Sequence, residues 1–354
     1  MEPQSSKPVG ETMKAIVQTG REEVEVQEVK RQSPSADEVL VRVKYAGVCG
    51  SDVHAYLQMD GFEWVKMPRV MGHEYAGTVV ETGENVTRFS VGETVVEIPI
   101  HPCGECHQCE IGEENVCQNT TLVGMETDGA YSEYTTVDAN QLIAIPDAIE
   151  TRHAAVTEPL AIAARAAYER ADVTPGDSIL VQGPGPIGML IAALLDSLGA
   201  HVIVSGLGKD TKYRLPLAKE LGIETVDISE TDLGEYIERE TDSIGVDTVF
   251  DTTGHKSGVE TAVDYARKGG EVIVVGLPGE SSELFFSPIV RGELDIKTSY
   301  GATRENYKQA VNVLEVGAID VETIIDTSYE SDGPASAFED FLAGQTCKPM
   351  FSFQ

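Results

Sequence analysis

Positive charge is scarce in this chain of 354 residues. It holds 26 Lys and Arg against 59 Asp and Glu, which gives a formal net charge of −33. Nucleic acids and anionic membranes bind basic surfaces, so both are poor partners for this chain. The acidic residues are interleaved with apolar ones, which indicates a charged folded surface rather than a disordered tail. Because molar salt screens charges beyond about 3 Å, we predict a salt-adapted, halophilic enzyme; an ordinary acidic cytosolic protein is the alternative.

Long apolar runs are also absent. No stretch reaches the roughly eighteen apolar residues that a membrane-spanning helix needs. Residues 1–12 lack the apolar core of a secretory signal. We therefore predict a cytoplasmic protein without a membrane partner, with a flexible tail at residues 1–12.

Cysteine is rare, yet four of the six cysteines lie close together, at Cys103, Cys106, Cys109 and Cys117. Their C-x2-C-x2-C-x7-C spacing lets one loop wrap a tetrahedral ion, and four thiolates make a closed structural zinc site. A disulfide cluster is the alternative, but cysteines are few and no secretory signal is visible. We predict a structural-zinc lobe at about residues 101–118.

The residue pattern changes near Pro159. Before it, short apolar stretches such as 39–45 and 76–83 are punctuated by Gly and Pro, which predicts a β-rich lobe. After it, helical and strand patterns alternate, and this alternation predicts a doubly wound parallel sheet of the α/β class. The expected helices are 161–170, 187–198, 213–221, 258–266 and 305–315, and the expected strands are 178–182, 201–205, 248–251 and 271–276.

A glycine-rich turn follows the first strand of this alternation. It reads G-P-G-P-I-G over residues 183–188 and includes Gly183, Gly185, Pro186, Ile187 and Gly188. Between a strand and a helix, such glycines let a pyrophosphate approach the backbone at a helix N-terminus, which favours anions. The turn is therefore predicted to bind a dinucleotide; a tight turn without a ligand is the alternative.

The end of the next strand indicates which dinucleotide is bound. NAD sites usually carry Asp or Glu there to bind the ribose 2′-hydroxyl, whereas this chain has Ser205 and Gly206. Lys209, Lys212 and Arg214 follow, and small residues with nearby cations suit a 2′-phosphate. We predict NADP+ in preference to NAD+. The alternative is that these cations merely begin a solvated helix and that both cofactors are used.

Cys49 and His73 are candidate ligands of a second metal. They stand in G-V-C-G-S-D-V-H and M-G-H-E-Y, where glycines permit tight turns. A thiolate, an imidazole and one carboxylate make a three-ligand zinc site with an open position for water or an alcohol oxygen. Either residue alone would more often serve packing or lie on the surface.

Together these motifs resemble the zinc-dependent medium-chain alcohol and polyol dehydrogenases. G-V-C-G-S-D-V-H, G-H-E, the four-cysteine loop, E-P-L and G-P-G-P-I-G occur in one order across nearly the whole chain. The resemblance implies a GroES-like catalytic domain at 13–161, a Rossmann domain at 162–299 and a return to the catalytic domain at 300–354. It also implies an active site in the cleft between them, with Cys49 and His73 as zinc ligands and with Glu74 and Glu158 alternating with water around the ion.

The resemblance implies further roles in the reaction. Zinc would lower the pKa of the substrate hydroxyl while hydride passes to the nicotinamide. Ser51 and His54 match positions that carry the released proton outward, with an idle histidine as the alternative for His54. Arg291 looks similar to a polyol-contacting arginine, although a structural salt bridge fits nearly as well. Tyr56 and Trp64 belong to a segment expected to shape the substrate pocket.

The predicted reaction moves hydride from a secondary alcohol of a polyol, sugar or sugar acid to NAD(P)+, with two zinc ions per chain. Glu158 stands where simple alcohol dehydrogenases carry cysteine, which argues against ethanol. A threonine 3-dehydrogenase-like enzyme acting on an amino alcohol or diol is the alternative, and a non-catalytic cofactor-binding or redox-sensing protein is a remote one. A homodimer or homotetramer is expected, through the Rossmann sheet near 272–276 and 281–288.

Overall fold

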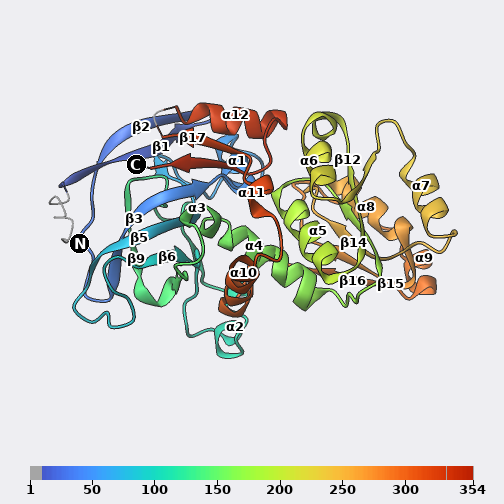
Figure 1. Ribbon diagram of the computed structural model, residues 1–354, viewed down its shortest axis with the longest axis horizontal. Coiled ribbons are helices and arrows are strands. Elements are labelled where there is room, and N and C mark those ends of the chain that lie inside the picture. The colour runs from blue at the N-terminus through green and yellow to red at the C-terminus, as the bar shows by residue number, and fades with distance from the viewer. Residues whose placement is uncertain (1–9, 332, 354) are drawn as a thin grey trace.

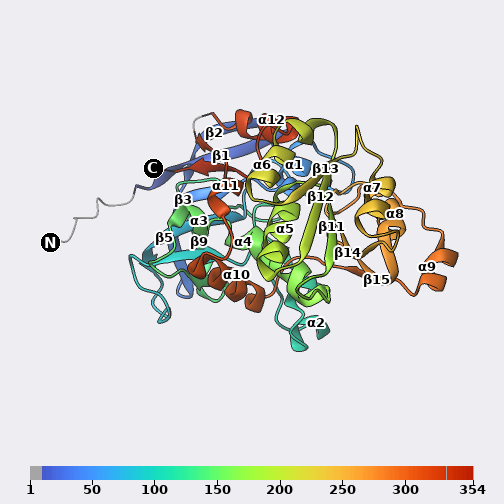
Figure 2. The ribbon, with the colours of Figure 1, turned by 45° about the vertical axis from the view of Figure 1, so that its right-hand side comes forward.

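The computed structural model describes residues 10–331 and 333–353, which form two lobes side by side (Figures 1 and 2). Of the tail predicted at residues 1–12, residues 1–9 lie outside this description, and strand β1 begins at Thr12. Within the described residues, no helix is both long and apolar enough to cross a bilayer.

The first lobe is rich in strands, as the sequence predicts, and these strands pair antiparallel except for β17 and β18, which run parallel. Its main sheet has the order β10-β6-β5-β3-β18-β17, with β9 also paired to β3, and a smaller sheet has the order β2-β1-β4. These strands are β1 (Thr12–Gly20), β2 (Glu23–Lys30), β3 (Glu38–Gly47), β4 (Arg69–Val70), β5 (Glu74–Thr82), β6 (Thr94–Glu97), β9 (Tyr134–Asp138), β10 (Leu142–Ala144), β17 (Thr327–Glu330) and β18 (Pro349–Ser352). Because β18 pairs with β3, the C-terminal segment lies in this first lobe.

Most helices of the first lobe are short, apart from the 13 residues of α10, and the loop of one small hairpin carries the four cysteines. The helices are α1 (Gly50–Tyr56), α2 (His107–Glu110), α3 (Thr151–Ala154), α10 (Arg304–Val316), α11 (Val321–Ile324) and α12 (Ala335–Ala343). The hairpin pairs β7 (Ile100–His101) with β8 (Thr121–Leu122), and α2 lies in the loop between them.

The second lobe is a six-stranded parallel sheet in the order β13-β12-β11-β14-β15-β16. Strand order reverses between β11 and β14, and ligands of such sheets bind at this switch point, beyond the carboxyl ends of the strands. The strands are β11 (Ser178–Gln182), β12 (His201–Gly206), β13 (Glu224–Asp227), β14 (Val246–Asp251), β15 (Ala266–Val274) and β16 (Asp295–Thr298). The helices are α5 (Pro186–Leu198), α6 (Arg214–Glu220), α7 (Leu233–Glu240), α8 (Lys256–Tyr265) and α9 (Phe286–Gly292). The predicted fold class is confirmed.

Helix α4 (Thr157–Ala164) joins the two lobes. It packs against α5 of the second lobe and α10 of the first lobe, and one continuous apolar core includes residues from both lobes. The helix predicted at 161–170 differs from the structure, because α4 starts four residues earlier and continues as a π-helix over Arg165–Arg170. The earlier start places Glu158 in the first turn of α4, between the lobes.

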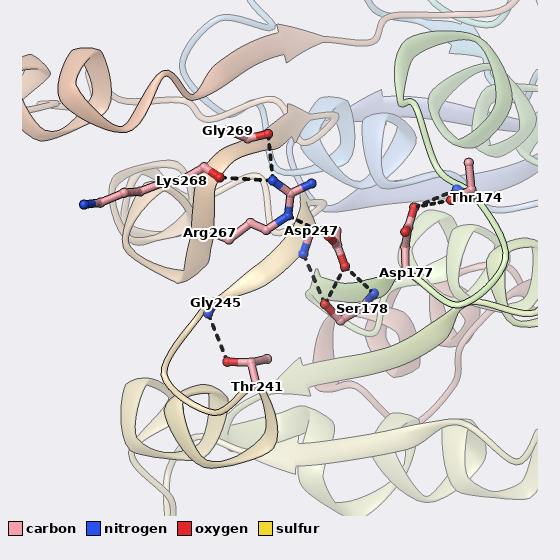
Figure 3. A network of polar contacts seen from close by, with 9 residues as sticks. All are labelled: Thr174, Asp177, Ser178, Thr241, Gly245, Asp247, Arg267, Lys268 and Gly269. Carbon is pink, nitrogen blue, oxygen red and sulfur yellow. Dashed lines mark hydrogen bonds and ion pairs between the residues drawn. The ribbon is translucent and has the colours of Figure 1, made fainter.

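A polar network closes the edge of the Rossmann sheet where its strands begin (Figure 3). Asp247 accepts hydrogen bonds from the backbone N–H and hydroxyl of Ser178, both at 2.8 Å, and from Arg267 Nε at 2.6 Å. These residues belong to β14, β11 and β15, so the network fixes the amino ends of three neighbouring strands. Polar chemistry at this edge is structural, and the opposite edge carries the dinucleotide turn.

Candidate active site and metal centres

Four cysteine sulfurs converge in the lobe that projects around α2 (Figure 1). Cys106 Sγ lies 3.5 Å from Cys109 Sγ and 3.7 Å from Cys117 Sγ, and Cys117 Sγ lies 3.5 Å from Cys103 Sγ. Zn–S bonds of about 2.3 Å in a tetrahedron set neighbouring sulfurs roughly 3.8 Å apart, whereas a disulfide needs about 2.05 Å. All six cysteines, which lie within the described residues, are free thiols. The four sulfurs therefore fit a structural zinc ion and exclude the disulfide alternative.

The electrostatics of this lobe also suit a cation. Backbone N–H groups of Gln118 and Cys109 lower the pKa of Cys106 to about 6, which favours a thiolate. Burial and hydrogen bonds with the neighbouring thiols raise the pKa of Cys109 to about 12, which favours its neutral form while no cation is near. A divalent cation among the sulfurs would stabilise all four thiolates.

A second ligand cluster lies where α1, β5 and the turn before β5 meet. Cys49 is the residue before α1, His73 follows the turn at Gly72, and Glu74 begins β5. One ligand atom from each of Cys49, His73 and Glu74 lies within 4.8 Å of the others. Gly72 has a φ of +91° and a Cβ there would lie 2.2 Å from the Tyr131 ring, so only glycine fits the turn that delivers His73.

Glu158 faces this cluster from the first turn of α4. It is buried, and its Oε2 atom has no hydrogen-bond partner in the described part of the chain. Burial raises its pKa to about 7, while the charge of His73 opposes that rise. Glu158 is not among the three residues whose ligand atoms group within 4.8 Å. An unpartnered carboxylate beside a thiolate and an imidazole is what a divalent cation would satisfy.

Asp52 was missed by the sequence reasoning and orients the metal-binding histidine. Its Oδ1 atom lies 3.5 Å from His73 Nδ1, and both atoms otherwise lack partners in the described residues. A carboxylate at Nδ1 leaves Nε2 for the metal. Although burial lowers the pKa of His73, the charge of Asp52 and the contact with Cys49 raise it well above its ordinary value. A signal was present, since Asp52 lies three residues after Cys49 in the same motif.

Lys348 is a second residue that the sequence reasoning missed. Its Nζ atom donates to both carboxylate oxygens of Glu74, at 2.8 and 2.6 Å, and to the Val48 carbonyl at 3.1 Å. Both side chains of the pair are only 1% exposed. Lys348 therefore balances one of several buried acids and competes with a metal for Glu74. No local motif could indicate it, because 274 residues separate the pair.

The predicted proton-relay residues lie together on α1. Ser51 and His54 are both half-buried and three residues apart, so they share one face of the helix. Burial lowers the pKa of His54, which keeps the ring neutral at pH 7 and able to accept a proton. Its ring contacts Phe62 edge-on at 5.2 Å, and Phe62 stacks on Trp64 at 6.2 Å.

The three residues predicted to contact the substrate lie in different parts of the structure. Trp64 is 44% exposed and continues the aromatic row from His54. Tyr56 instead points into the core, where its ring stacks on Phe338 at 4.7 Å and its hydroxyl donates to Glu22 O at 3.2 Å. Arg291 lies exposed on α9, at the outer end of the Rossmann lobe and far from α1 in both views (Figures 1 and 2). The structure brings neither Tyr56 nor Arg291 to the ligand cluster.

The glycine turn has the geometry of a pyrophosphate site. Gly183 has a φ of +98°, and Gly185 precedes Pro186 and Ile187 at the start of α5. A Cβ at Gly185 would meet no atom within 4 Å, so the backbone there is open to a ligand. A Cβ at Gly188 would lie 2.1 Å from Gly183 O, so this glycine serves close packing of helix against strand.

A cavity of about 620 Å³ opens just beyond the end of β12, where Ser205 and Gly206 lie. Its walls come from both lobes. The lining residues are Gly208, Lys209, Lys212, Tyr213, Ala343, Gly344 and Gln345.

Arg214, predicted to bind the cofactor, instead joins the lobes. Only 5% of it is exposed, and its guanidinium donates to the carbonyls of Thr346 and Phe341, each at 3.0 Å, and to Asp210 at 3.2 Å. These three contacts hold the guanidinium between the lobes, and Arg214 is not among the residues that line the cavity, whereas Lys209 and Lys212 are.

Comparison with known proteins agrees with this fold and these ligands. The alcohol dehydrogenase GroES-like domain matches residues 35–147, and the zinc-binding dehydrogenase domain matches residues 186–315. The chain is 34% identical to a sorbitol dehydrogenase of Halalkalibacterium halodurans, over 96% of this chain and 99% of that protein. It is 33% identical to an L-threonine 3-dehydrogenase of Pyrococcus furiosus, over 97% and 99%.

Solved structures extend the likeness to the cofactor. A zinc-binding dehydrogenase of Sinorhizobium meliloti bound to NADP has a TM-score of 0.90 and 29% identity, covering 97% of this chain and 99% of its own. An Escherichia coli alcohol dehydrogenase complexed with NADH has a TM-score of 0.89 and 33% identity, covering 97% and 100%.

Fold and ligands thus define a zinc-dependent, NAD(P)-dependent oxidoreductase that acts on alcohol CH–OH groups. The chain belongs to the zinc-dependent medium-chain dehydrogenases, in the branch that holds the sorbitol and threonine dehydrogenases.

Proposed function

We propose that the protein oxidises a secondary alcohol of a polyol, sugar or sugar acid and transfers hydride to NADP+, with one catalytic and one structural zinc ion per chain. The ligand set of Cys49, His73 and Glu74, with Glu158 beside it, carries this proposal. The similar proteins include a sorbitol dehydrogenase and a D-arabitol-phosphate dehydrogenase of Enterococcus avium, 34% and 33% identical. We propose a substrate of the same general class for this chain, a polyol or a related sugar compound.

The residues of the site divide the work. Zinc, when bound, supplies a Lewis acid that favours loss of the substrate's hydroxyl proton. Ser51 and the neutral His54 accept that proton from the substrate side and pass it toward solvent. The Gly185 turn holds the pyrophosphate, and the cavity beyond Gly206 holds the ribose end of the cofactor.

The test is a set of initial rates with NADP+ or NAD+ in molar salt. Pools of sugar alcohols, sugars, sugar acids and diols are offered separately from L-threonine, before and after chelation. We expect a polyol or sugar pool to reduce NADP+, loss of that rate on chelation, and recovery with Zn²⁺. Turnover of threonine alone would replace the proposal by the amino-alcohol alternative, and silence in every arm would contradict both.

The preference for NADP+ rests on the end of β12. A Cβ at Gly206 would lie 2.9 Å from Pro184 Cγ, so an acidic side chain that could bind a ribose 2′-hydroxyl has no room there. Two lysines line the adjacent cavity. Lys209 Nζ donates to Leu342 O at 3.0 Å, whereas Lys212 is exposed on the cavity wall. Lys212 is thus the better placed cation for a 2′-phosphate.

Replacing Lys212 by Ala is expected to raise KM for NADP+ by about 10- to 100-fold and to leave KM for NAD+ nearly unchanged, because a charge-assisted hydrogen bond contributes about 1.5–3 kcal/mol. Steady-state kinetics with both cofactors check this. Lys219→Ala is the matched control, since Lys219 is exposed in the last turn of α6 and does not line the cavity. Equal losses with both cofactors would contradict the assignment.

Salt dependence follows from the net charge of −33. We expect the melting temperature and the turnover rate both to rise between dilute buffer and molar KCl, because screening relieves repulsion among surface carboxylates. KCl is the appropriate salt, since sulfate stabilises most proteins through exclusion from their surfaces. Equal melting temperature and activity in both buffers would sink the proposal of salt adaptation.

We also propose a homo-oligomer formed through the edge of the Rossmann sheet at β16. The predicted interface strand at 272–276 falls mostly in β15, which pairs with both β14 and β16 and is therefore not an edge. The sheet order ends at β16, so one side of that strand pairs with no other described strand. Phe285, Phe286 and Val290 on the neighbouring α9 segment are 78%, 59% and 69% exposed, which is unusual on so acidic a surface. Pairing of two β16 edges across a two-fold axis would cover them. A monomeric mass by light scattering in molar salt would contradict this.

A further inference from the structure

Tyr131 lies against the segment that carries the metal-binding histidine. It is fully buried, its backbone N–H donates to Met71 O at 2.9 Å, and its ring sits directly over Gly72. Phe351 and Phe338 contact the ring edge-on, with centroids 5.0 and 6.4 Å away. The ring is therefore fixed by packing from the C-terminal segment, and its hydroxyl has a defined position.

That hydroxyl lies against Asp52. Tyr131 Oη lies 2.6 Å from Asp52 Oδ2 and 3.0 Å from Gly47 O, and the shorter contact goes to the carboxyl oxygen. A phenol has one proton to donate, and a short bond to a carboxylate is the stronger of the two. The backbone N–H of Cys49 donates to the same Oδ2 atom at 3.0 Å. Both donors hold one oxygen of Asp52 and leave the other turned to His73.

The second oxygen of Asp52 completes the chain. Oδ1 forms an ion pair with His73 Nδ1 at 3.5 Å, and neither atom has a hydrogen-bond partner among the described residues. The two hydrogen bonds to Oδ2 prevent the carboxylate of Asp52 from rotating, and this restraint also sets the position of Oδ1. Tyr131, Asp52 and His73 thus form one line of contacts from the aromatic core to the metal ligand.

We propose that the Tyr131 hydroxyl is a positioning residue for the catalytic zinc, acting through Asp52 on the orientation of His73. Partners behind the ligands of a metal site change its affinity by about 10- to 100-fold when removed. Tyr131 is fully buried and presents no surface to a substrate or cofactor. Its effect is therefore on how tightly the site holds zinc, and this separates the proposal from the proposed substrate.

The experiment is Tyr131→Phe, which removes the hydroxyl and keeps the packed ring. Zinc-loaded protein is titrated with a competing chromophoric chelator, and zinc release is followed for each site; the release missing from Cys49→Ala identifies the catalytic one. We expect Tyr131→Phe to release catalytic zinc at about 10- to 100-fold lower chelator strength. The four-cysteine zinc, an internal control in the same molecule, is expected to be unaffected.

Two further variants keep the test decisive. Tyr329→Phe is the matched control, because its hydroxyl also donates to a carboxylate, that of Asp340, at 2.6 Å and outside the metal cluster. Asp52→Asn should weaken catalytic zinc binding, and adding Tyr131→Phe to it should bring little further loss, since both act on one contact. Catalytic zinc affinity unchanged in Tyr131→Phe, or a loss that adds fully to that of Asp52→Asn, would overturn the proposal. If Tyr131→Phe does not fold, the chelator titration of Asp52→Asn tests the proposal instead. Catalytic zinc affinity equal to that of the wild type in Asp52→Asn would then contradict the proposal.

Discussion

Replacing Cys49 by Ala is expected to lower kcat by at least about 10³-fold while cofactor binding and the melting temperature change little. Cys49 supplies the thiolate of the catalytic cluster, and the loss of a metal that stabilises developing charge is at least as costly as the loss of one oxyanion-hole donor. The pyrophosphate turn lies in the other lobe and stays intact. Zinc content measured by atomic absorption should fall from two ions per chain to one, and cofactor affinity measured by fluorescence should stay within the error of the wild type.

The matched control for this variant is Cys347→Ala. Cys347 is buried and belongs to neither metal cluster, and burial raises its pKa to about 12, so it remains a neutral thiol. Its zinc content and turnover should equal those of the wild type. Turnover retained in Cys49→Ala at wild-type zinc content would refute the ligand assignment and with it the reaction proposed for the cluster.

The elements that the sequence predicts well are those in which an apolar pattern coincides with a clear boundary. Helix α5 begins at Pro186 and ends at Gly199 in the left-handed conformation, and its prediction at 187–198 misses only the first residue. By contrast, the sequence does not predict β13, which reads E-T-V-D and buries only Val226, or α7, which reads L-G-E-Y-I-E-R-E and buries only Leu233 and Ile237. On so acidic a surface, helices and edge strands carry little apolar signal, so tertiary packing rather than local pattern defines them.

The candidate site shows the same division between local and distant information. Cys49, His73 and the dinucleotide turn each lie in a short motif, which the sequence displays directly. Lys348 reaches Glu74 only because β18 pairs with β3, and no local sequence pattern near Lys348 predicts that pairing. Arg214 is likewise predicted to bind the cofactor, because the sequence alone does not show that the carbonyls of Thr346 and Phe341 contact its guanidinium. The sequence shows that a charged residue is present, but the residue that it contacts depends on how the distant strands and helices pack.

The structural-zinc lobe contacts the segment by which the chain returns from the Rossmann lobe. The side chain of Asn115, two residues before Cys117, donates from Nδ2 to Tyr300 O at 2.7 Å. A Cβ at the next residue, Gly301, would lie 2.7 Å from Ile100 Cδ1, so the lobe and the returning segment are tightly fitted. The four-cysteine loop therefore supports the segment where the chain returns from the second lobe to the first.

Replacing Cys109 by Ser is accordingly expected to lower the melting temperature by more than about 5 °C and the zinc content from two ions per chain to one. Zinc binding in such lobes is itself folding free energy, and a loss of even a few kcal/mol shifts the melting temperature by several degrees. Turnover should fall less than in Cys49→Ala, because the catalytic ligands remain and only the support of Tyr300 is loosened. Calorimetry and zinc analysis on both variants measure this contrast. A Cys109→Ser protein that keeps two zinc ions and its melting temperature would show that the four sulfurs, although correctly spaced, are not what holds this lobe.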